Sequence, residues 1–227
     1  GVELSAAQRR DYDTAWSQFR RDNNIARSGN DSEAGRAALL RFRQKAAFLR
    51  TSHTVEMAVS QVRKGRQVVI AVDLVTTAAD PIAAGIEDAG VKCARLYGDH
   101  PVEEERLAFQ LGHKPACVMT KTSAINLQSN EVLADGRRAT SALRVGLLAQ
   151  PKYSGIALKQ TLGRTARNGE TSVWFLLYAR DTVEERAAMT MVSRAQAATA
   201  SGGGDVGLWA QVAEDFGVRW LPESGDL

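Results

Sequence analysis

The stretch Gln67-Val-Val-Ile-Ala-Val-Asp73 is a short apolar run of strand length, and it sets the pattern for the rest of the chain. A helix is predicted directly after it, over about 78–89, ending at Gly90. The same alternation then recurs: further apolar strands are predicted at 91–97, 116–120, 143–149 and 172–179, and further helices at about 102–110 and 181–199. Apolar strands that alternate with helices indicate right-handed βαβ units. We therefore expect an α/β fold with a parallel sheet covered by helices on both faces.

In such sheets, ligands bind at the loops that follow the carboxyl ends of the strands. Several polar segments lie at these predicted ends: Asp73, Gly98-Asp99, Thr120 and the loop 149–154. This edge of the sheet is therefore the first place to look for a binding site.

The residues before the first strand predict helices. Ser5-Ala-Ala-Gln8 reads as a capping box, and the helix that it opens carries Tyr12, Trp16 and Phe19 on one stripe. The polar, turn-rich residues 22–32 are expected to form a loop. Two more helices are predicted over 33–49 and 54–64, the last one ended by Gly65.

Composition limits the class of protein. The chain has 227 residues, enough for one full α/β domain with appendages, and its net charge of +3 (29 basic against 26 acidic residues) permits a nucleic-acid partner without requiring one. Cys93 and Cys117 fall inside predicted apolar strands without C-x-x-C spacing, so buried, reduced thiols are expected and no metal site is predicted. The sequence has no run of 18 apolar residues and no signal peptide. We therefore expect a soluble protein in the cytoplasm or another reducing intracellular compartment, without a membrane partner.

The stretch Gln160-Thr-Leu-Gly-Arg-Thr-Ala-Arg-Asn-Gly169 carries the most specific signal. Read as a helix from about Ser154, it places Gln160, Arg164 and Arg167 on one face, at i, i+4 and i+7, and Asn168-Gly169 ends it. Arginines at this spacing are often only a solvated face. Two guanidiniums beside a strand edge are equally suited to bind a phosphate.

This string has the form Q-x-x-G-R-x-x-R, which resembles motif VI of superfamily 2 helicases and translocases. Other segments resemble the second RecA-like lobe of Swi/Snf-type ATPases in the same order. They are Val2–Gln8 with Tyr12, Arg43-Gln44, Val68–Asp73 (motif IV), Tyr97-Gly98-Asp99 with Arg106 and Phe109, Ala116–Leu127 (motif V), and Asp181–Arg186 (a T-x-E-E segment). The segment resembling motif V is shorter than usual and lacks the family's glycines. The resemblance implies a helical lead-in over 1–64, a RecA-like lobe over 65–200, and a Gly-rich hinge with a small helix over 201–227.

The sequence contains no G-x-x-x-x-G-K-[ST] and no strand ending in Asp-Glu that could hold magnesium. In the family that it resembles, those elements lie on a first RecA-like lobe, which binds ATP and Mg²⁺ in the cleft between lobes. The resemblance thus implies that this chain is a C-terminal fragment of a longer ATPase and is inactive alone. Arg167, with Arg164, would act as the arginine finger, and Gln160 and Gly163 would couple to the nucleotide. Thr120, Asn126 and Thr76 would contact the backbone of a nucleic acid, expected to be DNA.

Other interpretations stay open. The chain could instead be a non-catalytic RecA-like module that docks a replication or repair protein, or an unrelated doubly wound domain that binds a small nucleotide. The absence of a glycine-rich phosphate loop after the first strand argues against the last. The segment 129–143 reads either as a solvated loop or as a basic loop that reaches nucleic acid. The tail beyond residue 205, with Leu208, Val212 and Phe216, is expected to pack on the domain or to recruit a partner.

Overall fold

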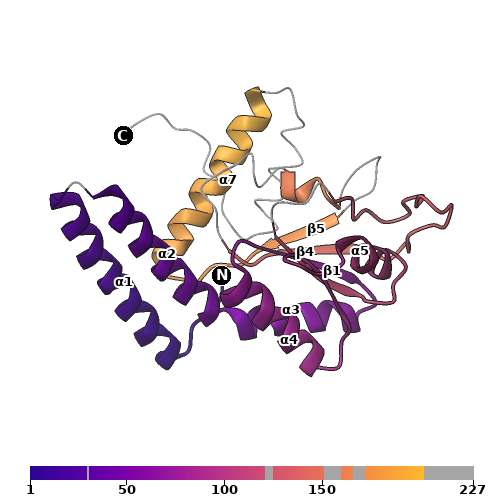
Figure 1. Cartoon of the computed structure of the whole chain (residues 1–227), viewed down its shortest axis with the longest axis horizontal. Helices are drawn as coiled ribbons and strands as arrows, with labels where there is room; N and C mark the ends of the chain where they lie inside the picture. Colours follow the sequence, from indigo (N-terminus) through magenta and orange to yellow (C-terminus); the bar gives the residue numbers. More distant parts are fainter. Residues whose placement is uncertain (30, 121–124, 151–159, 166–171, 202–227) are drawn as a thin grey trace.

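A computed structural model describes residues 1–29, 31–120, 125–150, 160–165 and 172–201 of the chain. A five-stranded sheet forms its centre, helices cover both faces of the sheet, and a pair of long helices projects to one side (Figure 1). None of the described helices is both long and apolar enough to cross a lipid bilayer.

The sheet is entirely parallel, with the strand order β2-β3-β1-β4-β5. The strands are β1 (Gln67–Val72), β2 (Cys93–Leu96), β3 (Ala116–Thr120), β4 (Arg144–Leu148) and β5 (Ser172–Leu176). Strand β1 lies in the middle, so that Val68 pairs with Ala116 on one side and Val145 on the other. Every residue of β1 is buried, as expected for a central strand covered on both faces. The α/β fold predicted from the alternating apolar runs is confirmed.

One face of the sheet is covered by α3 (Thr51–Arg63) and α4 (Asp80–Asp88). Ala58 of α3 and Ile82 and Ile86 of α4 pack on Val68 and Ile70 of the central strand. A π-helical turn, η1 (Val75–Ala79), leads from the end of β1 into α4. The helix predicted over 78–89 therefore begins one turn earlier, in π-helical form.

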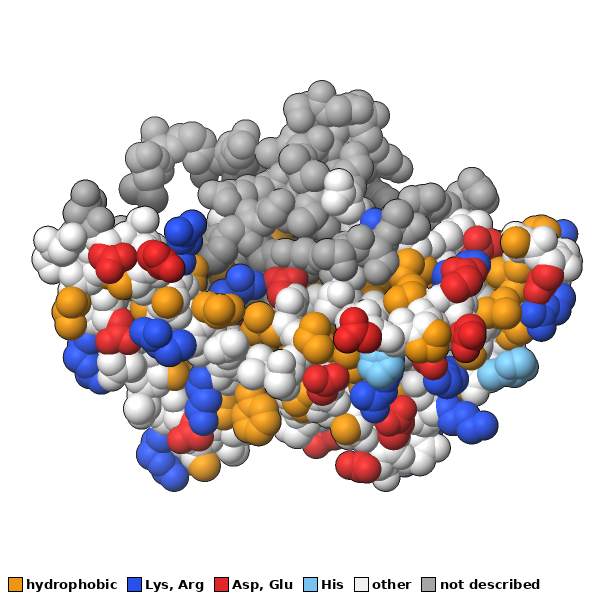
Figure 2. Space-filling model, in the orientation of Figure 1, with side chains coloured by type: hydrophobic (Ala, Val, Ile, Leu, Met, Phe, Trp, Pro, Cys, Tyr) orange, Lys and Arg blue, Asp and Glu red, His pale blue; other side chains and the backbone are white. Residues whose placement is uncertain are grey.

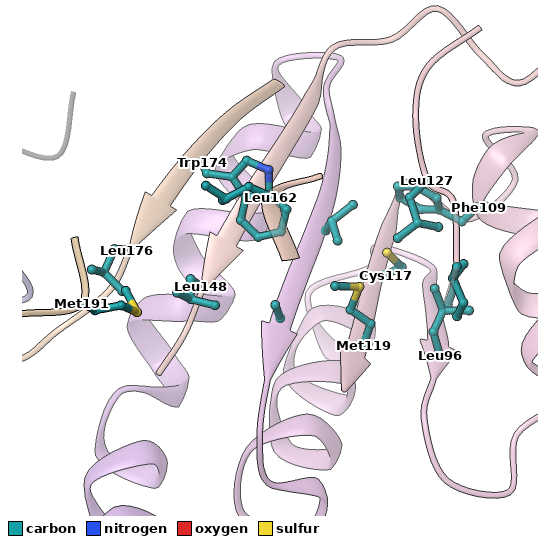
Figure 3. Packing of buried hydrophobic residues seen from close by; sticks show 14 of the residues in the cluster. Leu96, Phe109, Cys117, Met119, Leu127, Leu148, Leu162, Trp174, Leu176 and Met191 are labelled. Atoms are coloured by element: carbon teal, nitrogen blue, oxygen red, sulfur yellow. The ribbon is translucent and has the colours of Figure 1, made fainter. Parts of the chain in front are cut away.

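The opposite face is covered by α5 (Val102–Gln110) and α7 (Val183–Ser201). Figure 3 shows this second layer, in which Phe109, Leu127, Trp174 and Met191 lie along the strands. Cys117 lies in this layer and Cys93 in the other, and both are free buried thiols, as predicted. Burial raises the pKa of the Cys93 thiol to about 12, so it stays protonated at neutral pH.

The projecting pair of helices is α1 (Ala6–Ser28) and α2 (Ser32–Leu49). The predicted capping box is present: the backbone N–H of Ser5 donates to Gln8 Oε1 at 2.9 Å, and the N–H of Gln8 donates to Ser5 Oγ at 3.3 Å. Tyr12, Trp16 and Phe19 form the predicted stripe and pack on Phe42 of α2.

The loop predicted over 22–32 is wrong, because α1 continues to Ser28 and α2 already begins at Ser32. Packing against α2 overrides the weak helix propensity of the asparagines here, as the buried Ala26 illustrates. Asp31 caps α2 by accepting hydrogen bonds from the N–H groups of Glu33 and Ala34. Of the hinge and small helix predicted over 201–227, residues 202–227 lie outside the described residues.

A buried ion pair joins the start of α7 to the junction between α2 and α3. Arg50 lies directly after α2, and its Nη1 pairs with Glu184 Oε2. Its Nη2 donates to the carbonyl of Ala149, just beyond β4, at 3.0 Å, while Glu184 also accepts the N–H of Ala179 at 2.9 Å. This pair therefore connects both helical layers to the sheet.

We predict that Glu184→Ala lowers the free energy of unfolding by about 3–5 kcal/mol, because it leaves the Arg50 charge buried without its partner. Urea unfolding of the purified chain measures this change. Glu3→Ala is the control, since Glu3 forms an exposed ion pair with Arg180 and its loss should change stability little. The double variant Arg50→Met, Glu184→Leu should recover most of the loss, and equal losses in Glu184→Ala and Glu3→Ala would contradict the prediction.

Candidate functional site

The carboxyl ends of β1 and β3 bring together two of the residues predicted from the sequence. Val72 pairs with Thr120, the last residue of β3, and Thr76 lies in η1, which follows β1. The turn η1 packs against both β3 and α2. Both residues therefore lie at the same edge of the sheet, where Thr76 is exposed and Thr120 is half-buried.

Asp73 organises this edge and brings in two residues that the sequence analysis did not assign to a site. Its carboxylate forms an ion pair with Arg43 of α2, 2.7 Å from Nη2, and its backbone N–H donates to Gln150 Oε1 at 2.6 Å. Arg43 lies 30 residues before Asp73, and Gln150 lies 77 residues after it. The position of Asp73 at a strand end was enough to predict it at this edge from the sequence. Its partners Arg43 and Gln150 could not be predicted, because they are distant in sequence.

Asn126 lies elsewhere, and the structure does not bring it to Thr120 and Thr76. Its carbonyl accepts weak hydrogen bonds from Arg106 and Gln110 of α5, at 3.5 and 3.4 Å. Gln110 ends α5 and also contacts Arg144, the first residue of β4. Asn126 is therefore on the α5-covered face, toward the amino ends of the strands.

The predicted helix face over Gln160, Arg164 and Arg167 is wrong for the part that the structure describes. Gln160 is helical and exposed, but the helix ends at Leu162, and Gly163 and Arg164 lie in a turn. The N–H of Arg164 donates to the carbonyl of Thr161 at 3.1 Å, the i to i+3 pattern of a tightened last turn. Glycine has low helix propensity, which favours an end here. Arg167, and the predicted helix start at Ser154, lie outside the described residues.

Thr165 fixes the end of this turn to the sheet. Its hydroxyl accepts the indole N–H of Trp174 at 2.8 Å and lies 2.8 Å from the hydroxyl of Ser172. The Trp174 ring in turn lies directly over Gly146 of β4, where any side-chain carbon would overlap the ring. Figure 3 shows Trp174 beside Leu162, the last helical residue. Gly146 leaves room for the Trp174 ring, and the Trp174 N–H holds the turn at residues 163–165 through Thr165.

A backbone hydrogen bond connects the two segments that resemble motifs V and VI. The N–H of Leu127 donates to the carbonyl of Arg164 at 2.8 Å. The Arg164 side chain is half-exposed, and within the described part of the chain no carboxylate forms an ion pair with it. The backbone at Arg164 is thus anchored while its guanidinium stays accessible to a ligand.

A second buried arginine, Arg144, holds the Leu127 side of this junction in place. It was not predicted from the sequence. Its guanidinium donates to the carbonyl of Leu127 at 2.9 Å and to Gln110 Oε1 at 2.9 Å, and it lies 5.2 Å from the ring centroid of Phe109. Further hydrogen bonds go to the carbonyls of Gln128 and Ala142. These bonds compensate the burial of the charge and hold residues 127–142 against the sheet.

The segment 129–143, which the sequence left as either a solvated or a nucleic-acid-binding loop, forms a small hairpin. Val132 and Arg138 form an antiparallel bridge, and Gly136 turns the chain with φ of 83°. At its tip Asp135 binds Arg137 at 2.6 Å, and this side-chain hydrogen bond lowers the pKa of the Asp135 carboxyl. The hairpin leads into the amino end of β4, away from Thr76 and Thr120.

No protein-family model and no curated protein matches the chain. Solved structures that are similar to parts of it include the C-terminal part of the Fun30 ATPase domain, with 16% identity and a TM-score of 0.48 over 62% of this chain and 43% of that one. The RNA helicase Prp28 from Chaetomium thermophilum bound to ADP has 12% identity and a TM-score of 0.48, over 67% of this chain and 35% of that one. The DEAD-box protein SrmB from E. coli has 15% identity and a TM-score of 0.47, over 61% and 78%. The chain spans less than half the length of the first two.

We predict that Trp174→Phe, which keeps a ring over Gly146 but removes the N–H bond to Thr165, lowers stability by about 1–2 kcal/mol. It should also speed hydrogen exchange at the Leu127 amide. That amide donates to the Arg164 carbonyl, and the turn that carries Arg164 loses its hydrogen bond to Trp174. Amide exchange followed by NMR measures this, with Trp16→Phe on α1 as the control. Equal protection of Leu127 in both variants, after correction for global stability, would contradict the proposed anchoring.

Proposed function

We propose that the chain is the second motor lobe of an ATP-dependent DNA helicase or translocase. The observation that carries the proposal is the junction of Leu127 with Arg164. On a five-stranded parallel sheet, it joins the two segments that resemble motifs V and VI and leaves the Arg164 guanidinium accessible. The similarity of the flanking segments to Swi/Snf-type ATPases supports the same reading.

ATP and Mg²⁺ would be held by a first RecA-like lobe of the same polypeptide, because these 227 residues contain neither a Walker A sequence nor an Asp-Glu strand end. This chain would supply positive charge to the γ-phosphoryl group as negative charge develops on it. Arg167 would act as the finger with Arg164 beside it, while Gln160 and Gly163 would couple the turn to the nucleotide. Hydrolysis would then require the two lobes to close on each other.

Each lobe would carry one nucleic-acid-binding surface, and closure and reopening would move these two surfaces relative to one another. Thr76 and Thr120, at the carboxyl edge, would form the surface of this lobe, with Asn126 as a separate contact. Contacts of this kind bind phosphate and sugar, so they would position the lobe without reading sequence.

A second candidate function is a non-catalytic module that docks a replication or repair protein. It is favoured by apolar side chains that the projecting helices leave exposed, among them Ile25 at 71% and Phe48 at 54%. The motor is the better-supported function, because a docking module would not need an accessible arginine at the Leu127–Arg164 junction.

We predict that Arg167→Ala, in the polypeptide that carries both lobes, lowers ATP turnover about 10³-fold or more with only a modest loss of nucleotide affinity. Arg164→Ala should act in the same direction. Steady-state ATPase assays in the presence of DNA measure turnover, and nucleotide titrations measure affinity. Arg137→Ala, at the tip of the hairpin, is the control and should leave both unchanged. Normal turnover in Arg167→Ala would refute the finger assignment.

We also predict that the 227-residue chain alone neither hydrolyses ATP nor binds it tightly, because its arginines then lack a nucleotide positioned by a partner lobe. Isothermal titration calorimetry with Mg·ATP tests this directly. A dissociation constant in the micromolar range would contradict the assignment of the phosphate-binding elements to another lobe.

A further inference from the structure

Arginines recur at every seventh position along α2 and its end: Arg36, Arg43 and Arg50. Seven residues make almost two turns of an α-helix, so these side chains lie on one stripe. The stripe differs from the face that packs on α1, which carries Ala38, Phe42 and Ala46 instead. It is therefore a separate basic face of the projecting helix.

Two members of the stripe show where this face points. Arg50 donates to the carbonyl of Ala149, beyond the end of β4, and Arg43 pairs with Asp73, beyond the end of β1. Both partners lie at the carboxyl edge of the sheet. From there α2 extends away from the sheet (Figure 1), and Arg36 lies about two turns before Arg43 on this helix.

The three arginines are not equivalent. Arg50 is buried in its ion pair, whereas the side chain of Arg43 is 40% exposed although its partner Asp73 is only 8% exposed. A guanidinium has five N–H donors, and the hydrogen bond to Asp73 is made by Nη2. Arg43 is thus held in one orientation while part of its donor fork faces solvent. Arg36 is exposed, and among the described residues no carboxylate forms an ion pair with it.

The exposed part of Arg43 adjoins the edge that carries Thr76 and Thr120. Turn η1, which contains Thr76, packs against both α2 and β3, and Asp73 lies between η1 and β1. The polar residues Arg43, Asp73, Thr76 and Thr120 therefore all belong to elements that meet at this edge, beside the exposed side chain of Val75. On the face shown in Figure 2, acidic and basic side chains are otherwise interspersed, so a specific anion contact depends on particular arginines.

We infer that Arg36 and Arg43 bind the phosphate backbone of a nucleic acid that lies along the carboxyl edge, a contact that rests on the proposed motor function. Seven helical residues span about 10 Å, which corresponds to about three phosphates of one strand along a duplex axis. Asp73 orients Arg43 before the nucleic acid arrives, which reduces the entropy lost on binding. The projecting pair of helices, α1 and α2, thereby forms one side of the binding surface.

The test uses the 227-residue chain without nucleotide and a short fluorescein-labelled DNA duplex, with an RNA duplex of the same sequence as a second arm. Arg36→Gln and Arg43→Gln should each weaken binding about tenfold and reduce the slope of log K against log salt by about 0.9. The matched control is Arg41→Gln. It removes the same charge from the other side of α2, where Arg41 is 62% exposed and pairs with Asp22. This variant should change affinity less than about twofold.

A loss of binding in Arg36→Gln would not be caused by unfolding, because Arg36 contributes no ion pair within the described chain. Urea unfolding of this variant should show wild-type stability. Equal losses in Arg36→Gln and Arg41→Gln, no loss in Arg36→Gln and Arg43→Gln, or no binding of either duplex would overturn the inference. The same variant pattern with RNA alone would support the phosphate contact and identify RNA as the ligand. Because no ATP is present, this result is independent of the Arg167→Ala assay, which tests the motor function itself.

Discussion

The buried pair of Arg50 and Glu184 is the constraint on which the arrangement of the helices depends. It joins residues 134 positions apart, and it lies where α2, α3, α7 and the end of β4 converge. Two charges removed from water need further hydrogen bonds, and here the Ala149 carbonyl and the Ala179 N–H provide two of them, whereas Arg50 Nε is buried without a partner among the described residues. Because Arg50 cannot move without losing them, α2 is held at a fixed position against the carboxyl edge. The orientation of Arg43, two turns earlier, follows from that position.

Arg144 has the corresponding role at the amino edge. Its guanidinium donates to carbonyl and amide oxygens of residues 110–142, which compensate the burial of its charge. These bonds give a long connection a defined shape, and they place Leu127 where its N–H reaches the carbonyl of Arg164. The two buried arginines thus define opposite edges of one sheet, and each positions a different set of accessible side chains.

The sequence was sufficient for features that depend on local pattern. The apolar runs predicted all five strands, and the Ser5–Gln8 capping box predicted the start of α1, because both signals lie within a few residues. The end of α1 was missed because packing on α2 extends the helix through a polar stretch. The helix end at Leu162 was missed although Gly163 favours it locally, and the hydrogen bond from Trp174 to Thr165, which fixes the turn, depends on tertiary structure. The strand ends alone placed Asp73 and Thr120 at one edge, and Thr76 was predicted from the family resemblance. Arg43, Gln150 and Arg144 depend on partners distant in sequence.

The separation of the two edges constrains how a motor built on this chain could work. Arg164 and Asn126 lie toward the amino ends of the strands, and Arg43, Thr76 and Thr120 lie at or beyond the carboxyl ends. Between them lies a parallel sheet whose strands β1 and β4 are buried throughout, and such a close-packed layer is not easily deformed. If the proposed function holds, a nucleotide-dependent change at Arg164 would therefore reach the carboxyl edge mainly through rotation of the whole lobe. In that mechanism the stiffness of the sheet, and of the helices that Arg50 fixes to it, sets how far the nucleic acid moves for each closure.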